Sequence, residues 1–166
     1  MDEVGKPSGE FRRHQFEPLQ EPAVMFETTR RVEFRDTDSA QFAHFSAFFT
    51  YMEEAEHALF REIGTSVHVP DGDHVLSWPR VSASCDYQRP VRFEDVMTIQ
   101  LGIDHIGDSS VKFRCRFNRD GRRIAEGSIT IVCCELRAGK SPQKRAIPDT
   151  IRSQLQKFLW QDSEES

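Results

Sequence analysis

The segment from Asp38 to Phe48 contains two chemical groups that acyl hydrolysis needs, close together in the chain. Asp38 lies in a short polar loop, and a helical pattern begins directly afterwards, near Ser46. A carboxylate can act as a nucleophile or as a base on water. The unpaired N–H groups at a helix N-terminus can stabilise the oxyanion that forms when a carbonyl is attacked. This order predicts a site for attack on an activated carbonyl compound, with Asp38 as the candidate catalytic group.

The polar residues of this loop also have structural interpretations. Asp38 could instead accept backbone N–H groups, as aspartates often do in turns. For Asp36 we favour such a role, because this residue ends a predicted strand and could fix the loop. His44 is a candidate base or donor to the carbonyl, since imidazole titrates near neutral pH. The alternative is a histidine that flanks the helix in partial contact with solvent.

The side of the predicted helix opposite its apolar residues is most simply a solvated charged face. Its members are Glu53, Glu54, Glu56, His57 and Arg61.

The elements that must position these residues follow from the spacing of apolar side chains. Alternation predicts a strand over 25–35, and a three-to-four spacing predicts a helix over 46–63. Four further strands are predicted over 75–87, 95–105, 111–117 and 124–136, and a short helix from Pro148 to Leu159. One long helix followed by a run of antiparallel strands indicates the α+β class, with a sheet that can wrap around one central helix.

Composition limits the domain count and the class of partner. The chain has 166 residues, enough for one domain, and a net charge of -5 that argues against a nucleic-acid partner. No apolar run is long enough to span a bilayer. We expect a flexible N-terminal extension over 1–24, one domain over 25–160 and an acidic tail over 161–166. The four cysteines form no CxxC pair or zinc-like spacing, which favours a reducing compartment, the cytoplasm.

Three motifs, in this order, resemble those of the hotdog fold, and within it the 4-hydroxybenzoyl-CoA thioesterase family. The first runs from Val32 to Ala40 and is similar to the family's strand that ends in Asp-x-Asp-x-x-Gly; the helix start at 48–55 follows it. The second, 85–99, is similar to a Tyr-x-x-Pro motif with a following Asp and Ile. The third runs from Ala125-Glu126-Gly127 to Ile147-Pro148.

The resemblance implies an antiparallel β-sheet wrapped around one long central helix, and hydrolysis of an acyl-CoA thioester without a metal or organic cofactor. It assigns the catalytic carboxylate to Asp38 and the oxyanion donor to the backbone N–H of Phe45. Since other hotdog thioesterases use a glutamate on the central helix, it also makes Glu53 a candidate to orient water; the alternative is that Glu53 belongs to the solvated charged face. The resemblance also implies a homodimer or homotetramer with ligand sites between subunits. An open sheet edge independently favours association.

This sequence departs from the family pattern at three positions. Gln41 stands where glycine is usual, Phe45 replaces tyrosine or histidine, and Ala47 stands where asparagine is common. These changes keep open a non-catalytic protein that binds acyl-CoA or only dimerises. A hotdog hydratase or dehydratase is a weaker alternative, because its Asp-x-Asn-Pro-x-His pattern is absent here.

Candidate substrate contacts come from aromatic and basic residues. Phe42, near the helix start, is expected to line the acyl pocket. A basic stripe on an alternating strand and the turn after it could bind the phosphates of CoA, with Arg114 and Arg116 as the named candidates. Its other members are Lys112, Arg119, Arg122 and Arg123. The alternative for these arginines is an exposed sheet face that carries charge to prevent aggregation.

Overall fold

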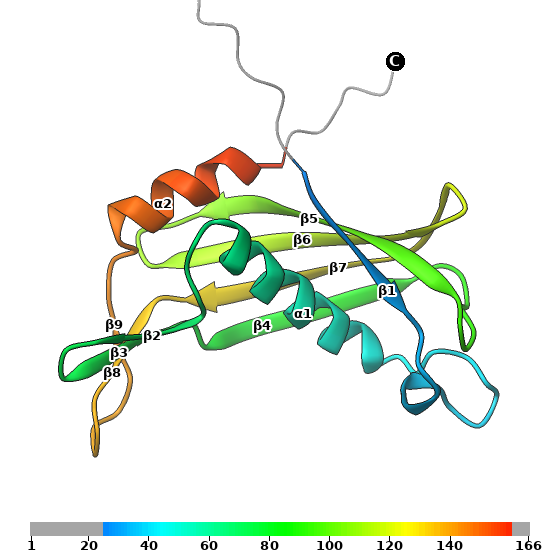
Figure 1. Cartoon of the computed structure of the whole chain (residues 1–166), viewed down its shortest axis with the longest axis horizontal. Helices are drawn as coiled ribbons and strands as arrows, with labels where there is room; N and C mark the ends of the chain where they lie inside the picture. Colours follow the sequence, from blue (N-terminus) through cyan, green and yellow to red (C-terminus); the bar gives the residue numbers. More distant parts are fainter. Residues whose placement is uncertain (1–24, 161–166) are drawn as a thin grey trace, which may run out of the picture.

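The computed structural model describes residues 25–160, so the predicted extension and acidic tail lie outside the described residues. A five-stranded antiparallel sheet with the order β1-β5-β6-β7-β4 curves around the long helix α1 (Figure 1). Its elements are β1 (Phe26–Arg31), α1 (Ala47–Glu62), β4 (Arg80–Tyr87), β5 (Val96–Ile106), β6 (Ser110–Arg119) and β7 (Arg122–Val132). A short 3-10 helix, η1 (Phe34–Asp36), connects β1 to the loop before α1.

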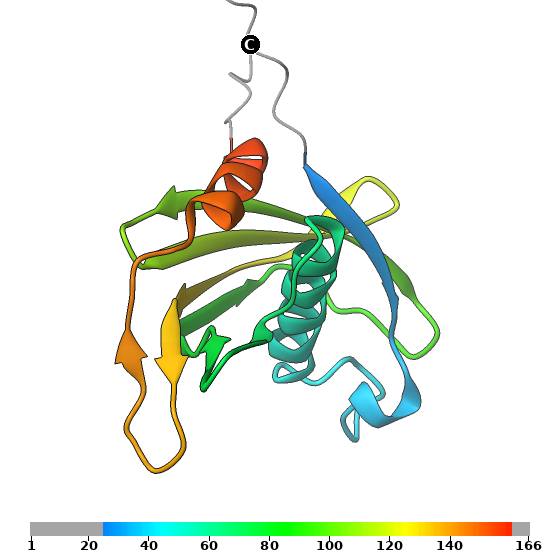
Figure 2. The same ribbon diagram turned by 60° about the vertical axis from the view of Figure 1, so that its left-hand side comes forward.

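A second, smaller sheet lies at the left end of the molecule in Figure 1, and the turned view shows it to one side of α1 (Figure 2). It consists of β2 (His68–Asp71), β3 (His74–Ser77), β8 (Cys134–Leu136) and β9 (Gln143–Lys144). The chain then returns to the main sheet through α2 (Asp149–Leu155) and η2 (Gln156–Phe158), and the N–H of Trp160 donates to the Ile103 carbonyl on β5 at 2.7 Å. Within residues 25–160, none of the helices combines the length and apolar character needed to cross a bilayer.

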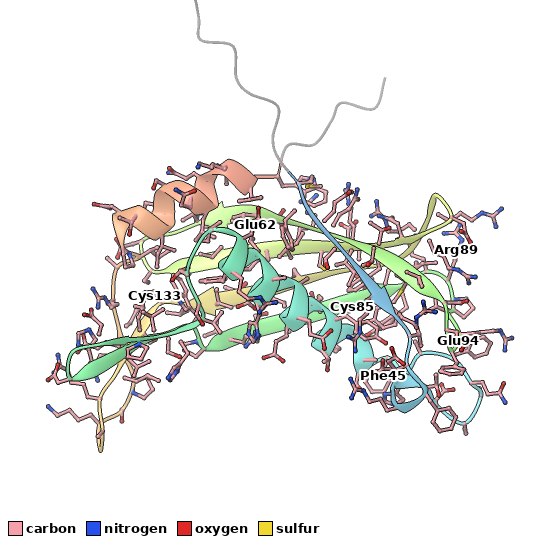
Figure 3. The ribbon with its side chains drawn as sticks, in the orientation of Figure 1. Phe45, Glu62, Cys85, Arg89, Glu94 and Cys133 are labelled. Carbon is pink, nitrogen blue, oxygen red and sulfur yellow. The ribbon has the colours of Figure 1, made fainter. Side chains whose placement is uncertain are left out.

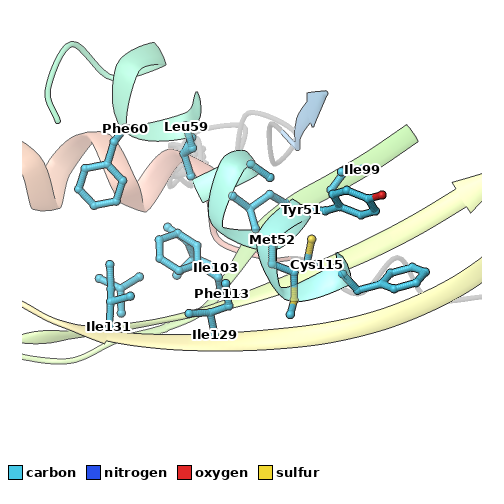
Figure 4. Packing of buried hydrophobic residues seen from close by; sticks show 14 of the residues in the cluster. Tyr51, Met52, Leu59, Phe60, Ile99, Ile103, Phe113, Cys115, Ile129 and Ile131 are labelled. Carbon is cyan, nitrogen blue, oxygen red and sulfur yellow. The ribbon is translucent and has the colours of Figure 1, made fainter. Parts of the chain in front are cut away.

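The core lies between α1 and the concave face of the main sheet (Figure 4). On β6, Val111, Phe113, Cys115 and Phe117 are buried and alternate with more exposed residues, as the sequence pattern predicts. Gly127 on β7 allows α1 to approach the sheet closely: a Cβ there would lie 2.6 Å from the Met52 sulfur and 2.7 Å from the Ser84 carbonyl oxygen. The Ala-x-Gly motif is therefore explained by helix-to-sheet packing.

Two predicted strands are each divided in the structure. Residues 75–87 form β3 and β4, which belong to different sheets, and residues 124–136 belong to β7 and β8. The first division falls at Trp78-Pro79, where proline has no N–H for a sheet ladder. At the second, the N–H of Cys133 leaves the ladder and donates to the Ser109 carbonyl at 2.7 Å. Alternating burial cannot reveal such a change of partner, because both halves keep the same period.

The interpretation of the charged side of α1 as wholly solvated is wrong at Glu56. This side chain is completely buried, and its Oε2 accepts a 2.9 Å hydrogen bond from Arg80 at the start of β4. Its Oε1 is buried without a hydrogen-bond partner among the described residues. Burial raises the pKa of Glu56 to about 7, although the nearby Arg80 guanidinium opposes this effect.

We expect Glu56 to make the stability of the fold depend on pH. Its pKa is higher in the folded protein than in the unfolded chain, so its contribution is complete below the ordinary glutamate pKa and is lost as pH rises through about 7. Between about pH 5 and about pH 8, we expect the unfolding free energy to fall by on the order of 2–3 kcal/mol from this group. Urea unfolding of Glu56→Gln at both pH values should show a smaller fall.

Glu54→Gln is the matched control, because Glu54 lies on the same helix with a half-exposed side chain. It should retain the pH dependence of the wild type. An equal fall in the wild type and in Glu56→Gln would show that Glu56 does not titrate in this range.

Candidate active site

Asp38 organises the loop between η1 and α1 through one of its two carboxylate oxygens. Oδ1 accepts hydrogen bonds from the N–H groups of Ala40 at 2.8 Å and Phe42 at 3.2 Å. The backbone closes the same turn, since the Asp38 N–H donates to the Phe42 carbonyl at 2.8 Å. No hydrogen bond to Oδ2 is present within residues 25–160. Asp38 therefore stabilises the turn through Oδ1, while its second carboxylate oxygen, Oδ2, remains available to react.

The backbone N–H groups that follow Asp38 are almost all occupied. Ala43 donates to the Val91 carbonyl at 2.8 Å, and His44 donates to the Asp36 carbonyl at 2.7 Å. Further along, Ser46 donates to the His44 ring, and Ala47 donates to the His44 carbonyl. Among residues 40–47, only the N–H of Phe45 makes no hydrogen bond within the described part of the chain. It is an available donor immediately before the helix.

Tyr87, at the end of β4, fixes the peptide that carries this donor. Its hydroxyl donates to the Phe45 carbonyl at 2.9 Å, and its ring packs edge-on against Phe48 with centroids 5.2 Å apart. Burial, followed by the neighbouring Cys85, raises the pKa of Tyr87 to about 12, so the hydroxyl remains a donor at neutral pH. Tyr87 belongs to the second sequence motif but was not among the predicted site residues.

Asp36 ties the loop to the helix and does not contact the cavity that Asp38 lines. Its Oδ2 accepts hydrogen bonds from the Tyr51 hydroxyl at 2.8 Å and from the Glu33 N–H at 3.0 Å. Burial and the hydrogen bond to Asp36 raise the pKa of Tyr51. Since Tyr51 is fully buried on α1, this contact fixes the loop relative to the core.

A cavity of about 600 Å³ brings the predicted residues together at the start of α1. Asp38, Phe42, His44 and Phe45 line one side, and the segment from Tyr87 to Val91 lines the other. Figure 3 shows Phe45 at the same end of the molecule as Arg89 of this second segment. The size of the cavity, and a lining that combines aromatic and aliphatic side chains with a few polar groups, are those of a small-molecule site.

His44 lines the cavity and also stabilises the helix start. Its Nδ1 lies 2.7 Å from the Ser46 hydroxyl, so the Ser46 side chain does not cap the helix directly. Glu53 lies further along α1 and does not line the cavity; its carboxylate pairs with Arg80 at 3.1 Å. Within one chain, the structure brings His44 but not Glu53 to Asp38.

Arg114 and Arg116 also lie outside this cavity. Arg114 Nε is 2.8 Å from Asp104, and Arg116 Nε is 2.9 Å from Glu126. Both guanidinium groups lie over the Trp160 ring, at 5.0 Å and 4.2 Å from its centroid. They belong to the sheet face opposite α1, and a role in substrate binding remains a prediction.

Comparison with known proteins identifies the family. A family model described as the thioesterase-like superfamily matches residues 32–155, most of the chain. The chain belongs to this thioesterase-like superfamily. The matched segment includes the Asp38 loop, α1 and the whole main sheet except β1. The predicted thioesterase family and α+β hotdog fold are thereby confirmed.

Individual relatives of this thioesterase agree with that assignment. A 1,4-dihydroxy-2-naphthoyl-CoA hydrolase of Synechococcus elongatus is 24% identical over 132 residues, which cover 79% of this chain and 95% of the relative. The crystal structure of a 1,4-dihydroxy-2-naphthoyl-CoA thioesterase from Synechocystis matches with a TM-score of 0.69 and 21% identity, covering 80% of this chain and 96% of that one. The gentisyl-coenzyme A thioesterase BH1999 matches with a TM-score of 0.63 and 27% identity, covering 78% and 98%.

Gln41, which occupies the usual glycine position of the motif, adopts the backbone conformation that favours glycine. Its φ is +65°, in the left-handed region, where a side chain costs about 1 kcal/mol or more. Its N–H donates to the Asp38 carbonyl at 2.9 Å, so the turn is retained despite this strain. The departure from the family pattern therefore leaves the Asp38 loop geometrically intact.

We expect Gln41→Gly to raise the free energy of unfolding by about 1 kcal/mol, because relief of the left-handed strain exceeds the entropy cost of glycine. Gln41→Ala is the matched control: it removes the same side chain but keeps the strain, and should change stability by less than about half a kcal/mol. Urea unfolding measures both. A glycine variant less stable than the alanine variant would contradict the strain argument.

Proposed function

We propose that the chain hydrolyses an acyl-CoA thioester to the free acid and CoA at the Asp38 cavity. The observation that carries this proposal is the pairing of the Asp38 carboxylate, with one oxygen unbonded within the described residues, and the unoccupied Phe45 N–H on the same cavity. The arrangement supplies an attacking or activating group and an oxyanion donor. The related CoA thioesterases support the substrate class.

In the proposed reaction, the thioester carbonyl oxygen accepts a hydrogen bond from the Phe45 N–H. Asp38 either attacks the carbonyl carbon or removes a proton from an attacking water. If Asp38 attacks, the C–S bond breaks as an anhydride forms between the acyl group and Asp38, and water then hydrolyses this anhydride to release the acid and restore the carboxylate. If water attacks, its hydroxyl adds to the carbonyl carbon and the C–S bond breaks. On both routes CoA leaves as the thiolate and takes up the proton that water gives up. His44 lines the same cavity, and its imidazole could hold the transferred proton.

An aromatic acyl group fits the cavity best. Phe42, Phe45, Phe48 and Tyr87 line it, and aromatic rings favour edge-on or offset contacts with one another. The relatives named for the 1,4-dihydroxy-2-naphthoyl and gentisyl thioesters act on aromatic acyl groups of this kind. We therefore propose aromatic acyl-CoA thioesters as the substrate class, with Phe42 as a pocket residue.

Asp38→Asn should lower kcat at least a hundredfold, because the amide cannot act as a base or nucleophile. It retains an oxygen that can accept from Ala40 and Phe42, so the loop should keep its shape. Thiol release from benzoyl-, naphthoyl- and long-chain acyl-CoA thioesters measures the effect.

Ser39→Ala is the control for this experiment, since Ser39 lies in the same loop, is exposed and does not line the cavity. Absence of turnover on every thioester would exclude the proposed function and favour a non-catalytic binding protein. If Asp38→Asn turns over at the rate of the wild type, another residue must be the catalytic group, and His44 and Glu53 are the next candidates. Hydration of crotonyl-CoA would instead indicate the hydratase alternative.

We also propose that two copies pair through β4. This strand ends the main sheet, and nearly all its residues are exposed, including Val81 at 62%. An unpaired edge with exposed apolar side chains is a template for another strand. Antiparallel pairing of β4 with β4 of a second copy would extend the sheet and place each Tyr87 at the interface.

Sedimentation at micromolar concentration should therefore give a dimer, and hydrogen exchange should show β4 amides protected more strongly as concentration rises. The other edge of the sheet, β1, is the internal control, and its protection should not depend on concentration. A monomer at all concentrations, or concentration-dependent protection at β1 alone, would contradict this interface.

A further inference from the structure

A second cavity, of about 400 Å³, adjoins the Asp38 cavity and has a different chemical character. Its lining residues are Arg89, Pro90, Arg119, Asp120, Arg122 and Ile124. Arg89 and Pro90 also line the Asp38 cavity, so this short segment forms a wall common to both. Three of the six lining residues are arginines, on a protein whose net charge is negative.

The turn of the β6–β7 hairpin holds two of these arginines together. Asp120 and Gly121 have φ values of +49° and +70°, as in a tight two-residue hairpin turn, and Arg119 and Arg122 are direct register partners. Like charges in directly opposed positions destabilise a strand pair. A bound anion would relieve this repulsion.

The charges of these arginines are only partly compensated. Arg119 lies 2.5 Å from Asp95 and 3.5 Å from the exposed Asp120. By contrast, no carboxylate lies within ion-pair distance of Arg122 or Arg89 in the described part of the chain. Arg89 Nη1 donates to the Arg123 carbonyl at 2.6 Å, which fixes its guanidinium while leaving its charge unneutralised.

The wall between the two cavities is rigidly attached to the sheet. The N–H groups of Gln88 and Arg89 both donate to the Ile124 carbonyl at the start of β7, at 2.8 Å and 3.1 Å. A ligand that occupies both cavities must therefore pass over Arg89 and Pro90. A CoA thioester has the required form: an acyl end, a flexible uncharged arm and a nucleotide end that carries several phosphates.

We propose that the cavity formed by Arg89, Arg119 and Arg122 binds the phosphates at the nucleotide end of the CoA thioester. This inference rests on the proposed function for the identity of the ligand. Arginine guanidinium groups bind phosphate with paired, charge-assisted hydrogen bonds. The cavity takes Arg119 and Arg122 from the predicted basic stripe and adds Arg89. It leaves out Arg114 and Arg116, whose guanidinium groups already pair with carboxylates.

Arg122→Ala is the sharpest test, because the Arg122 side chain makes no hydrogen bond or ion pair with another described residue, while its backbone pairing with Arg119 does not depend on the side chain. With an aromatic acyl-CoA, we expect KM to rise about tenfold with kcat little changed. With the matching acyl-pantetheine thioester, which lacks the nucleotide, Arg122→Ala should leave KM unchanged. Arg122→Glu should raise KM for the CoA thioester further, and Arg122→Lys should restore part of the affinity.

Arg61→Ala is the control for loss of one positive charge, since Arg61 is exposed near the far end of α1. It should leave both KM values unchanged. Equal KM values for the CoA thioester in wild type and Arg122→Ala would overturn the phosphate site. A rise in KM of the pantetheine thioester equal to that of the CoA thioester would also overturn it, because Arg122 would then act on the shared part of the substrate.

Direct binding separates this proposal from the proposed reaction. Calorimetry with the adenosine bisphosphate that corresponds to the nucleotide end of CoA should show binding that is about tenfold weaker in Arg122→Ala and weakens with added salt. If neither thioester is hydrolysed but this binding is seen, the catalytic proposal fails and the phosphate site stands. If both thioesters are hydrolysed and the bisphosphate binds equally to both proteins, only the phosphate site fails.

Discussion

The burial of α1 in the concave face of the main sheet is the contact on which the rest of the molecule depends. Met52 sits against Gly127, where no side chain would fit, and the fully buried Tyr51 lies one position earlier on the helix. Through its hydroxyl, Tyr51 holds Asp36, and Asp36 in turn holds the loop that contains Asp38. The start of the helix is therefore positioned by the core, and the loop with Asp38 is positioned by the helix.

The same packing also positions the segment after β4, which lines the other side of the Asp38 cavity. The loop between η1 and α1 is connected to the segment after β4 by the hydrogen bond from Ala43 to Val91 and by the contact of Tyr87 with Phe45. The segment after β4 is fixed to β7 through Ile124. Consequently the Asp38 cavity and the arginine cavity share one anchored segment as a common wall, which is the arrangement that the proposed CoA thioester would need.

Two residues, Glu56 and Gln41, lower the stability of the folded protein. Glu56 places a carboxyl group in the core with one oxygen unsatisfied among the described residues, and Gln41 adopts a glycine conformation. Each is held by its surroundings: Arg80 compensates part of the buried charge, and the hydrogen bonds of the Asp38 turn maintain the strained backbone. Such costs are tolerated because the large apolar core offsets them.

The sequence by itself determined the family, the α+β class, the central helix and the position of Asp38 before it, because these depend on local periodicity and on motifs of adjacent residues. It also placed Phe42, His44 and Phe45 beside Asp38, since neighbours in a short loop remain neighbours. Only the tertiary structure decided which residues meet across long separations: Tyr87 with Phe45, Arg80 with Glu56, and the segment after β4 with the β6–β7 hairpin. It also showed that residues 75–87 and 124–136 each divide between two sheets. A strand's own pattern records which residues are buried, but not which partner buries them.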